Sequence, residues 1–270
     1  MLVYLLLFIF GLIIGSFLNV VVYRETHESK GKKTGLKAWI PEWAIGRSCC
    51  PKCKKEIKWY DNIPLLSYLL LKGKCRFCKQ HISSSYPLVE LVVGLEFVWV
   101  YWLLGRFAFF QQMEGFFSFV VLGFWLFIFS ISLALAIIDI RLGILPDSLI
   151  ISGTIVAVGR LFITGRWEFL LSGLGLMGFF LFLYLITQGK GIGFGDVKLA
   201  FFIGVVLGWW QWVLVAMFIA FLTGAIMGVI LIAMGKKNMK SAIPFGPFLL
   251  GGMLLAKLFG EYIWLSYVGI

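Results

Sequence analysis

The sequence predicts an all-α polytopic membrane protein with about eight transmembrane helices and a small zinc-ribbon-like cytoplasmic domain between the first two. Three observations lead to this fold class. Of the 270 residues, 61% are hydrophobic and only 14% are charged, which is unlike a soluble globular domain of this size. The apolar residues gather in runs of about 20, the length that crosses a bilayer. The one long polar segment carries two Cys-x-x-Cys pairs.

Residues 1–22 form the first predicted helix. The run is apolar except for two glycines, a serine and an asparagine, and as a helix it rises about 33 Å, enough to cross the hydrocarbon core. No charged residue precedes it and no A-x-A-like cleavage site ends it. We therefore expect a retained span rather than a cleaved signal peptide.

Hydropathy predicts seven further spans after the polar segment 23–86. They lie near 87–105, 115–138, 147–165, 168–187, 197–211, 212–235 and 245–268. A tryptophan cluster at 209–212 divides the sixth span from the seventh, because indole rings favour the headgroup level. The predicted domains are the first helix 1–22, a cytoplasmic zinc-binding domain 23–86 and a seven-helix transmembrane domain 87–270.

The placement of basic residues predicts the orientation. Residues 23–86 hold 14 of the 24 lysines and arginines, and the positive-inside rule places such a loop in the cytoplasm. With the N-terminus outside, 20 of the 24 lie on the inner face. The basic loop would lie against anionic membrane lipid or favour an acidic partner. Because no base-reading motif accompanies the net charge of +11, we expect no nucleic-acid binding.

The two Cys-x-x-Cys pairs, Cys50 with Cys53 and Cys75 with Cys78, predict a zinc site. Each short turn can present two thiolates to one face of a tetrahedral ion. Four cysteine ligands leave no open position, so the zinc would be structural. A metal would also stabilise a loop with too little apolar mass for its own core.

Alternatives to this ligand set stay open. A disulfide pair is disfavoured in a reducing cytoplasm, and two matched pairs disfavour a redox dithiol. Cys49 is adjacent to Cys50, so either thiol is a candidate for that ligand position. His81 is a weaker alternative ligand.

Two aspartates lie where a predicted span meets a polar turn. Asp139 is in Ile-Ile-Asp-Ile-Arg at 137–141, and Asp196 is in Gly-Ile-Gly-Phe-Gly-Asp-Val-Lys at 191–198. An ionisable residue at membrane depth is expensive and indicates a functional site. Both fall on the predicted cytoplasmic face, where two neighbouring carboxyls can share a proton and titrate as a unit. Hydrolysis of a peptide bond by two carboxyls requires one ionised and one protonated group.

We expect three residues near Asp196 to support its function. Gly193 and Gly195 leave the backbone accessible, so that an extended substrate strand can approach. Lys198 either holds Asp196 ionised or marks the cytoplasmic interface.

A purely structural interpretation of the aspartates also exists. In it, Asp196 is the N-cap of the sixth span and Asp139 is a helix-end residue that reaches interfacial water. Asp147 differs from both, because it follows a proline and opens the fourth span. We interpret it mainly as a cap.

In order along the chain, these motifs resemble those of the type IV prepilin peptidases, the prepilin leader peptidase/N-methyltransferase family of GxGD-type membrane aspartic proteases. A single Gly-x-Gly-Asp would be weak, whereas the ordered set is specific. The matching segments are 15–21 with 23–24, 50–53, 59–68, 73–78, 86–90, 138–139, 145–147, 193–198 and the Pro-Phe-Gly-Pro turn within 243–248.

The resemblance implies an enzyme of the bacterial inner membrane that serves type IV pilus assembly or type II secretion. It would cleave the short basic leader from type IV prepilins or pseudopilins after a glycine, on the cytoplasmic side. Asp139 and Asp196 would be the catalytic pair, and Asp147 a non-catalytic aspartate. The family also implies N-methylation of the new N-terminus with S-adenosylmethionine, in the loop where Gly73 and Lys74 stand in a family motif.

Two other function classes remain as alternatives. A membrane transporter or scaffold with cation-binding intramembrane aspartates would predict inverted repeats, and the sequence shows no internal repeat. A GxGD protease of the presenilin or signal-peptide-peptidase type would leave the cysteine-rich loop unexplained.

Overall fold

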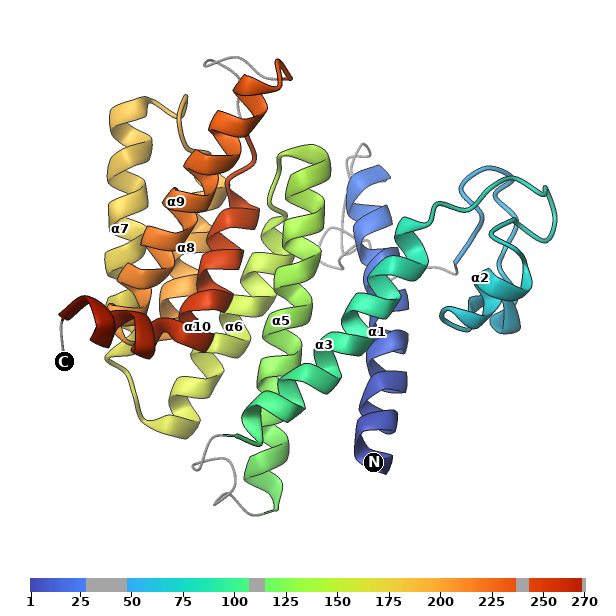
Figure 1. The fold of residues 1–270 in the computed structure, drawn as a ribbon, viewed down its shortest axis with the longest axis horizontal. Coiled ribbons are helices and arrows are strands. Elements are labelled where there is room, and N and C mark those ends of the chain that lie inside the picture. The colour runs from blue at the N-terminus through green and yellow to red at the C-terminus, as the bar shows by residue number, and fades with distance from the viewer. Residues whose placement is uncertain (28–47, 107–114, 237–242, 269–270) are drawn as a thin grey trace, which may run out of the picture. The chain divides into compact units, whose positions relative to one another are not determined.

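The computed structural model describes residues 1–27, 48–106, 115–236 and 243–268 (Figure 1). Residues 28–47 of the predicted zinc-binding domain, and two of the lysines used to predict the orientation, Lys237 and Lys240, lie outside these ranges. The chain divides into two compact units, Met1–Ala134 and Leu135–Ile270. Every regular element in the described ranges is helical, which confirms the all-α prediction.

Ten helical elements are described. Those of the first unit are α1 (Leu2–His27), the 3-10 helix η3 (Trp59–Asn62), α2 (Leu66–Leu70), α3 (Ser85–Leu104) and the larger part of α5 (Phe116–Leu142). Those of the second unit are the end of α5, then α6 (Asp147–Thr164), α7 (Phe169–Thr187), α8 (Phe194–Leu207), α9 (Trp210–Ala233) and α10 (Gly246–Val268).

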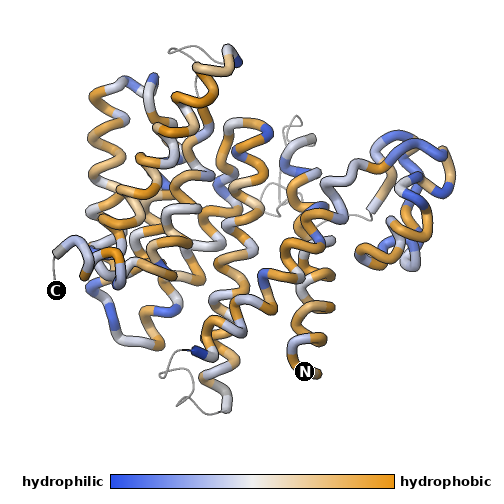
Figure 2. Tube along the Cα trace, in the orientation of Figure 1, coloured by the Kyte–Doolittle hydropathy of each residue, from blue (hydrophilic) through white to orange (hydrophobic). Residues whose placement is uncertain are grey.

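Seven helices of the described ranges are long and apolar enough to cross a membrane, namely α1, α3, α5, α6, α7, α9 and α10. They are mostly hydrophobic along their length, whereas the cysteine-bearing segment before α3 is largely hydrophilic (Figure 2). The protein is therefore a multi-pass membrane protein, and seven of the eight predicted spans are helices of this kind in the described ranges.

Helix α8, the predicted sixth span, differs from these seven helices. It has 14 residues and rises about 21 Å, less than the hydrocarbon thickness of about 30 Å. Its residues are buried almost without interruption from Asp196 to Leu207, and it packs against α6, α7, α9 and α10. The predicted sixth span is therefore a short helix enclosed by its neighbours.

Two helix boundaries differ from the predicted ones in a way that matters for the aspartates. Helix α5 continues to Leu142 instead of ending at 138, and α8 begins at Phe194 instead of 197. Hydropathy falls at the polar residues of both segments, but the helical backbone continues through them. Asp139 therefore lies in the last turn of α5, and Asp196 in the first turn of α8.

Glycines allow the backbones of neighbouring helices to approach each other. A Cβ atom added at Gly204 of α8 would lie 2.6 Å from the Cα atom of Gly173 in α7 and 2.6 Å from the carbonyl oxygen of Ser172. The same close approach joins α1 to α3 at Gly15, where a Cβ would lie 2.7 Å from the Cα atom of Glu90. Small residues at such contacts are characteristic of membrane helix packing.

We expect Gly204→Ala to destabilise the second unit, because the added methyl group meets backbone atoms that cannot rotate away. The cost of such overpacking is about 1–3 kcal/mol. Gly178→Ala in α7 is the matched control, since a Cβ there has no neighbour within 4 Å. Thermal unfolding in detergent should show a lower Tm for Gly204→Ala alone. Equal Tm values for the two variants would contradict this packing.

Candidate functional site

Asp139 is held by the beginning of α10. It is only 4% exposed, and its Oδ2 atom accepts a hydrogen bond of 2.9 Å from the backbone N–H of Gly246. A Cβ atom at position 246 would lie 2.7 Å from the same oxygen. A glycine is therefore needed for this approach, and the positive end of the α10 dipole faces the carboxyl.

Asp196 is held in a similar way by the beginning of α8. It is 8% exposed, and its Oδ2 atom accepts a hydrogen bond of 3.1 Å from the backbone N–H of Gly193. Gly193 is the N-cap residue, and Asp196 lies three residues later. The interpretation of Asp196 as the N-cap itself is therefore wrong, although an acid at this position also binds the open helix end.

The two aspartates come together in the second unit. A Cβ atom at Gly246, the donor to Asp139, would lie 3.3 Å from Cδ2 of Leu145. One at Gly195, next to Asp196, would lie 3.1 Å from Cβ of the same leucine. The charge of Asp139 acts on Asp196 across this short space. Within the described ranges, no lysine or arginine forms an ion pair with either carboxyl. Two neighbouring buried carboxyls with neutral donors disfavour a doubly ionised state. The arrangement therefore favours the state in which one carboxyl is protonated and the other is ionised.

Lys198 contacts Asp147 and not Asp196. Its Nζ atom lies 2.7 Å and 2.8 Å from the two carboxyl oxygens of Asp147 and 5.1 Å from the centre of the Phe194 ring. The suggestion that Lys198 holds Asp196 ionised is therefore not supported by its position. The ion pair instead joins the beginning of α6 to the beginning of α8.

The predicted capping role of Asp147 is wrong. Pro146 is the N-cap residue of α6 and its backbone is extended, and both carboxyl oxygens of Asp147 accept hydrogen bonds from Lys198. Because proline occupies the N-cap position, Asp147 is the first helical residue. Its exposed side chain forms an ion pair with Lys198.

The two supporting glycines differ in their surroundings. A Cβ atom at Gly195 would lie 3.1 Å from the Cβ atom of Leu145, so a glycine lets the beginning of α8 approach the turn before α6. A Cβ atom at Gly193 would make only an ordinary contact of 3.5 Å with Asp196. The approach of a substrate strand to these glycines stays a prediction.

The four predicted cysteine ligands come together in the first unit. The sulfur atoms of Cys50, Cys53, Cys75 and Cys78 all lie within 4.8 Å of one another, and those of Cys50 and Cys78 are 3.9 Å apart. Tetrahedral zinc with Zn–S bonds of about 2.3 Å separates its sulfurs by about 3.8 Å. The cluster therefore fits zinc, and Cys49 is not part of it.

Two equivalent backbone turns present these thiols. The N–H of Lys54 donates to the carbonyl of Cys50 (2.9 Å), and the N–H of Lys79 donates to that of Cys75 (3.0 Å). Both lysines adopt positive φ angles, 59° and 58°. Hydrogen bonds from the backbone N–H groups of Cys78 and Phe77 lower the pKa of the Cys75 thiol to about 7, whereas burial and the neighbouring thiols raise that of Cys78 to about 11.

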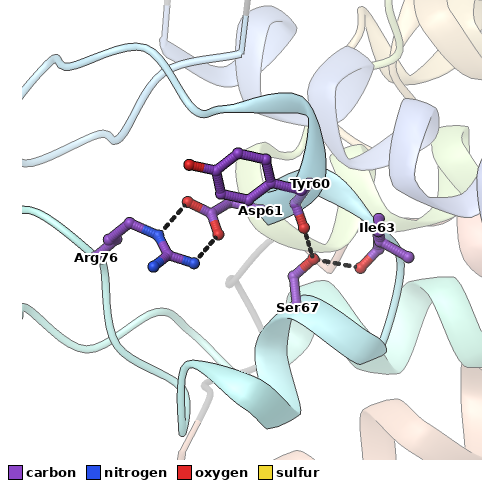
Figure 3. A network of polar contacts seen from close by, with 5 residues as sticks. All are labelled: Tyr60, Asp61, Ile63, Ser67 and Arg76. Atoms are coloured by element: carbon purple, nitrogen blue, oxygen red, sulfur yellow. Dashed lines mark hydrogen bonds and ion pairs between the residues drawn. The ribbon is translucent and has the colours of Figure 1, made fainter.

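An ion pair ties the second cysteine turn to η3. Arg76 donates from Nε and Nη2 to the two carboxyl oxygens of Asp61, at 2.7 Å and 2.6 Å (Figure 3). At the beginning of α2, the hydroxyl of Ser67 donates to the carbonyl of Ile63 and to that of Tyr60 in η3. The hydrogen bond from Arg76 holds the pKa of Asp61 below its usual value.

Gly73 and Lys74, the predicted S-adenosylmethionine residues, lie in the turn before Cys75. Gly73 has a φ of +67°, and a Cβ atom there would lie 3.0 Å from the hydroxyl of Tyr68. The turn itself therefore requires the glycine, which is buried against Tyr68. The side chain of Lys74 is exposed, and a role of either residue in cofactor binding stays a prediction.

Comparisons with known proteins show the family of the chain. Residues 9–104 match the bacterial peptidase A24 N-terminal domain, and residues 126–229 match the type IV leader peptidase family. A prepilin leader peptidase/N-methyltransferase of Stutzerimonas stutzeri is 33% identical over 96% of this chain and 92% of its own length. The chain belongs to the type IV leader peptidase family.

Other relatives of the family have the same printed name. The prepilin leader peptidase/N-methyltransferase of Pseudomonas aeruginosa is 34% identical over 96% of this chain and 91% of its own, and that of Aeromonas salmonicida is 35% identical over the same shares. No solved structure matches the chain. Both aspartates lie in the segment that matches the leader peptidase family, and the four cysteines lie in the segment that matches the N-terminal domain.

The sequence did not single out Gly246 as a partner of Asp139. The signal available was a glycine between two prolines at the start of the last predicted span. Proline and glycine at a helix start leave backbone N–H groups accessible to an acceptor.

We expect the purified protein to contain one zinc ion per chain, measured by elemental analysis. Cys53→Ser should lose the metal, because three thiolates bind zinc more weakly than four. Cys49→Ser is the matched control and should retain it. Retention of zinc by Cys53→Ser with loss in Cys49→Ser would contradict the ligand set.

We expect Asp61→Asn to lower the thermal stability near neutral pH. A carboxyl whose pKa is lowered by folding stabilises the protein above its unfolded pKa of about 3.9 and loses this contribution as the pH falls through the folded pKa. The difference in Tm between wild type and Asp61→Asn should therefore shrink in acid. A difference that grows below about pH 4 would contradict this ion pair.

Proposed function

We propose that this chain is an aspartic endopeptidase of the bacterial inner membrane that removes the leader from type IV prepilins or pseudopilins. The observation that carries the proposal is the pair of buried aspartates, Asp139 and Asp196, at adjoining helix ends in the second unit. The substrate class is supported by membership of the type IV leader peptidase family and by the names of the relatives. A cation-binding transporter or scaffold is not favoured by these relatives.

The proposed mechanism assigns the two carboxyls opposite roles. The ionised carboxyl takes a proton from water while the water oxygen bonds to the scissile carbonyl carbon, and the protonated carboxyl donates its proton to the carbonyl oxygen. Collapse of the tetrahedral intermediate breaks the C–N bond. The carboxyl that took the proton from water gives it to the leaving amine, and the other carboxylate recovers a proton from a hydroxyl of the intermediate. The structure's hydrogen bonds to both aspartates end on Oδ2, so Oδ1 of each is the oxygen that we assign to water and substrate.

The orientation and the domains are part of the proposal. We propose that the N-terminus lies outside and that the aspartates lie at the cytoplasmic face, the side to which the positive-inside rule assigns the basic loop. Residues 1–22 are then the first span, 23–86 the zinc-binding domain and 87–270 the GxGD protease domain. A basic leader on the cytoplasmic side would reach the aspartates without crossing the membrane.

We also propose that the chain N-methylates the new N-terminus, as the names of its relatives indicate for those proteins. S-adenosylmethionine would supply the methyl group. Lys74 is exposed and remains available to a bound cofactor, whereas the Cα atom of Gly73 faces Tyr68. In this proposal the zinc holds the cysteine segment together and takes no part in either reaction.

The experiment that tests the proposal uses purified protein in lipid nanodiscs with a purified prepilin, analysed by mass spectrometry. We expect release of the leader with or without S-adenosylmethionine, and the mass of one added methyl group only with it. An intact prepilin after prolonged incubation with zinc-loaded, folded protein would overturn the peptidase assignment.

We expect Gly246→Ala to reduce leader cleavage, because the added methyl group would occupy the space of the Asp139 carboxyl. A displacement of a catalytic group by about 1 Å costs about 100-fold in rate. Gly251→Ala on the same helix is the control, since a Cβ there meets no neighbour within 4 Å. Cleavage by Gly246→Ala at the rate of Gly251→Ala would contradict the role of the α10 terminus.

A further inference from the structure

The segment before α3 exposes large apolar side chains. Trp59 is 81% exposed, Leu69 71% and Leu70 73%. Leu66 is also exposed and shares one face of α2 with the other two leucines, because residues three and four apart are neighbours on a helix. We call Trp59, Leu66, Leu69 and Leu70 the apolar patch. Figure 2 shows this hydrophobic stretch on a segment that is otherwise largely hydrophilic.

A hydrogen bond fixes the patch beside the membrane-spanning helices. The backbone N–H of Leu65, the residue before α2, donates to Oε2 of Glu90 in α3 at 2.8 Å. Glu90 is buried and also forms a hydrogen bond with Ser16 of α1. Position 90 is five residues into α3, which places it about 8 Å along the helix. The beginning of α2 therefore lies at the level of the second turn of α3 and of the middle of α1, within the length of both spans.

The backbone at Leu65 adopts a conformation that a leucine rarely takes. Its φ is +58°, and such a conformation persists only where the surroundings hold it. The acceptor supplied by Glu90 is one such restraint. The position of α2 against α3 is thus set by a specific contact and not by a loose loop.

A groove opens between the same segment and α1. Its volume is about 860 Å³, and its walls include Ile9, Ile13 and Phe17 of α1 and Asn62 and Pro64 of the segment. The three α1 residues lie on one face of a helix that is apolar enough to span a membrane. All three side chains are exposed, so the apolar wall of the groove is open on the outside of this span.

Cations and aromatic rings flank the patch. Lys58 directly precedes Trp59, and Lys72 follows α2. The Nζ atom of Lys58 lies 5.6 Å from the centre of the Tyr60 ring. Aromatic rings and lysines together are characteristic of the headgroup region, where cations meet anionic lipid.

We propose that η3 and α2 form an interfacial anchor that inserts the apolar patch into the leaflet at which α1 ends and α3 begins, with a lipid acyl chain in the groove beside α1. The partner is an anionic phospholipid surface. Depth, the open groove and the flanking cations all favour lipid over a second copy of the chain or a peptide. The anchor would hold the cysteine segment against the membrane, and it does not depend on the proposed peptidase activity.

The test places the photocrosslinking residue p-benzoylphenylalanine at one position at a time in the full chain, reconstituted in nanodiscs that contain phosphatidylglycerol. Leu66 and Leu70 sample the patch, and the exposed Lys52 and Lys79 of the cysteine turns are matched controls. Zinc content verifies the fold of each variant. We expect lipid adducts, identified by mass spectrometry, at Leu66 and Leu70 and at most traces at the controls.

Two results would overturn the proposal. One is an equal yield of lipid adducts at all four positions, and the other is an adduct at Leu70 with a second copy or an added prepilin in place of lipid. A second measurement uses the Leu70 probe in a Lys58→Glu, Lys72→Glu background. We expect its lipid adducts to fall at least about threefold, because each lysine near an anionic surface contributes to binding. Lys52→Glu with Lys79→Glu is the control pair, and an equal loss there would contradict the role of the flanking cations.

Discussion

The burial of two carboxyls beside each other is the constraint on which the second unit depends. Such a pair is costly in a membrane protein unless backbone donors stabilise it and the two groups share a proton. Here the donors are the N–H groups of Gly193 and Gly246, at the open N-terminal ends of α8 and α10. Both helices must therefore begin at the same place, and the last turn of α5 must reach it with Asp139.

The rest of the second unit follows from this requirement. Helix α8 is too short to span the membrane, and α6, α7, α9 and α10 enclose it. Close backbone contact at Gly204 and Gly173 fixes α8 against α7, while the ion pair of Lys198 with Asp147 fixes its first turn against α6. In the first unit the cysteine cluster and the contact of Glu90 with Leu65 serve the same purpose for a segment without its own core.

Hydropathy and motif spacing predicted the helices, the cysteine cluster and the meeting of Asp139 with Asp196, because each depends on local pattern or on the shared face of helix ends. The partners of the carboxyls were not predictable in this way. Gly246 donates through its backbone N–H, and a backbone donor has no characteristic residue type in the sequence. Lys198 pairs with Asp147 instead of Asp196, because the carboxyl of Asp147 lies exposed beside it. The predicted cap at Asp147 failed because Pro146 already occupies the N-cap.

The measurement that tests this account most directly is cleavage of a purified prepilin by Asp139→Asn, Asp196→Asn and Asp147→Asn, each verified for folding and zinc content. The account predicts that the first two variants lose cleavage and that Asp147→Asn retains it, since an exposed ion pair contributes at most about 1 kcal/mol. Cleavage at the wild-type rate by Asp139→Asn or Asp196→Asn would contradict the aspartate pair and return the site to a structural or ion-binding role.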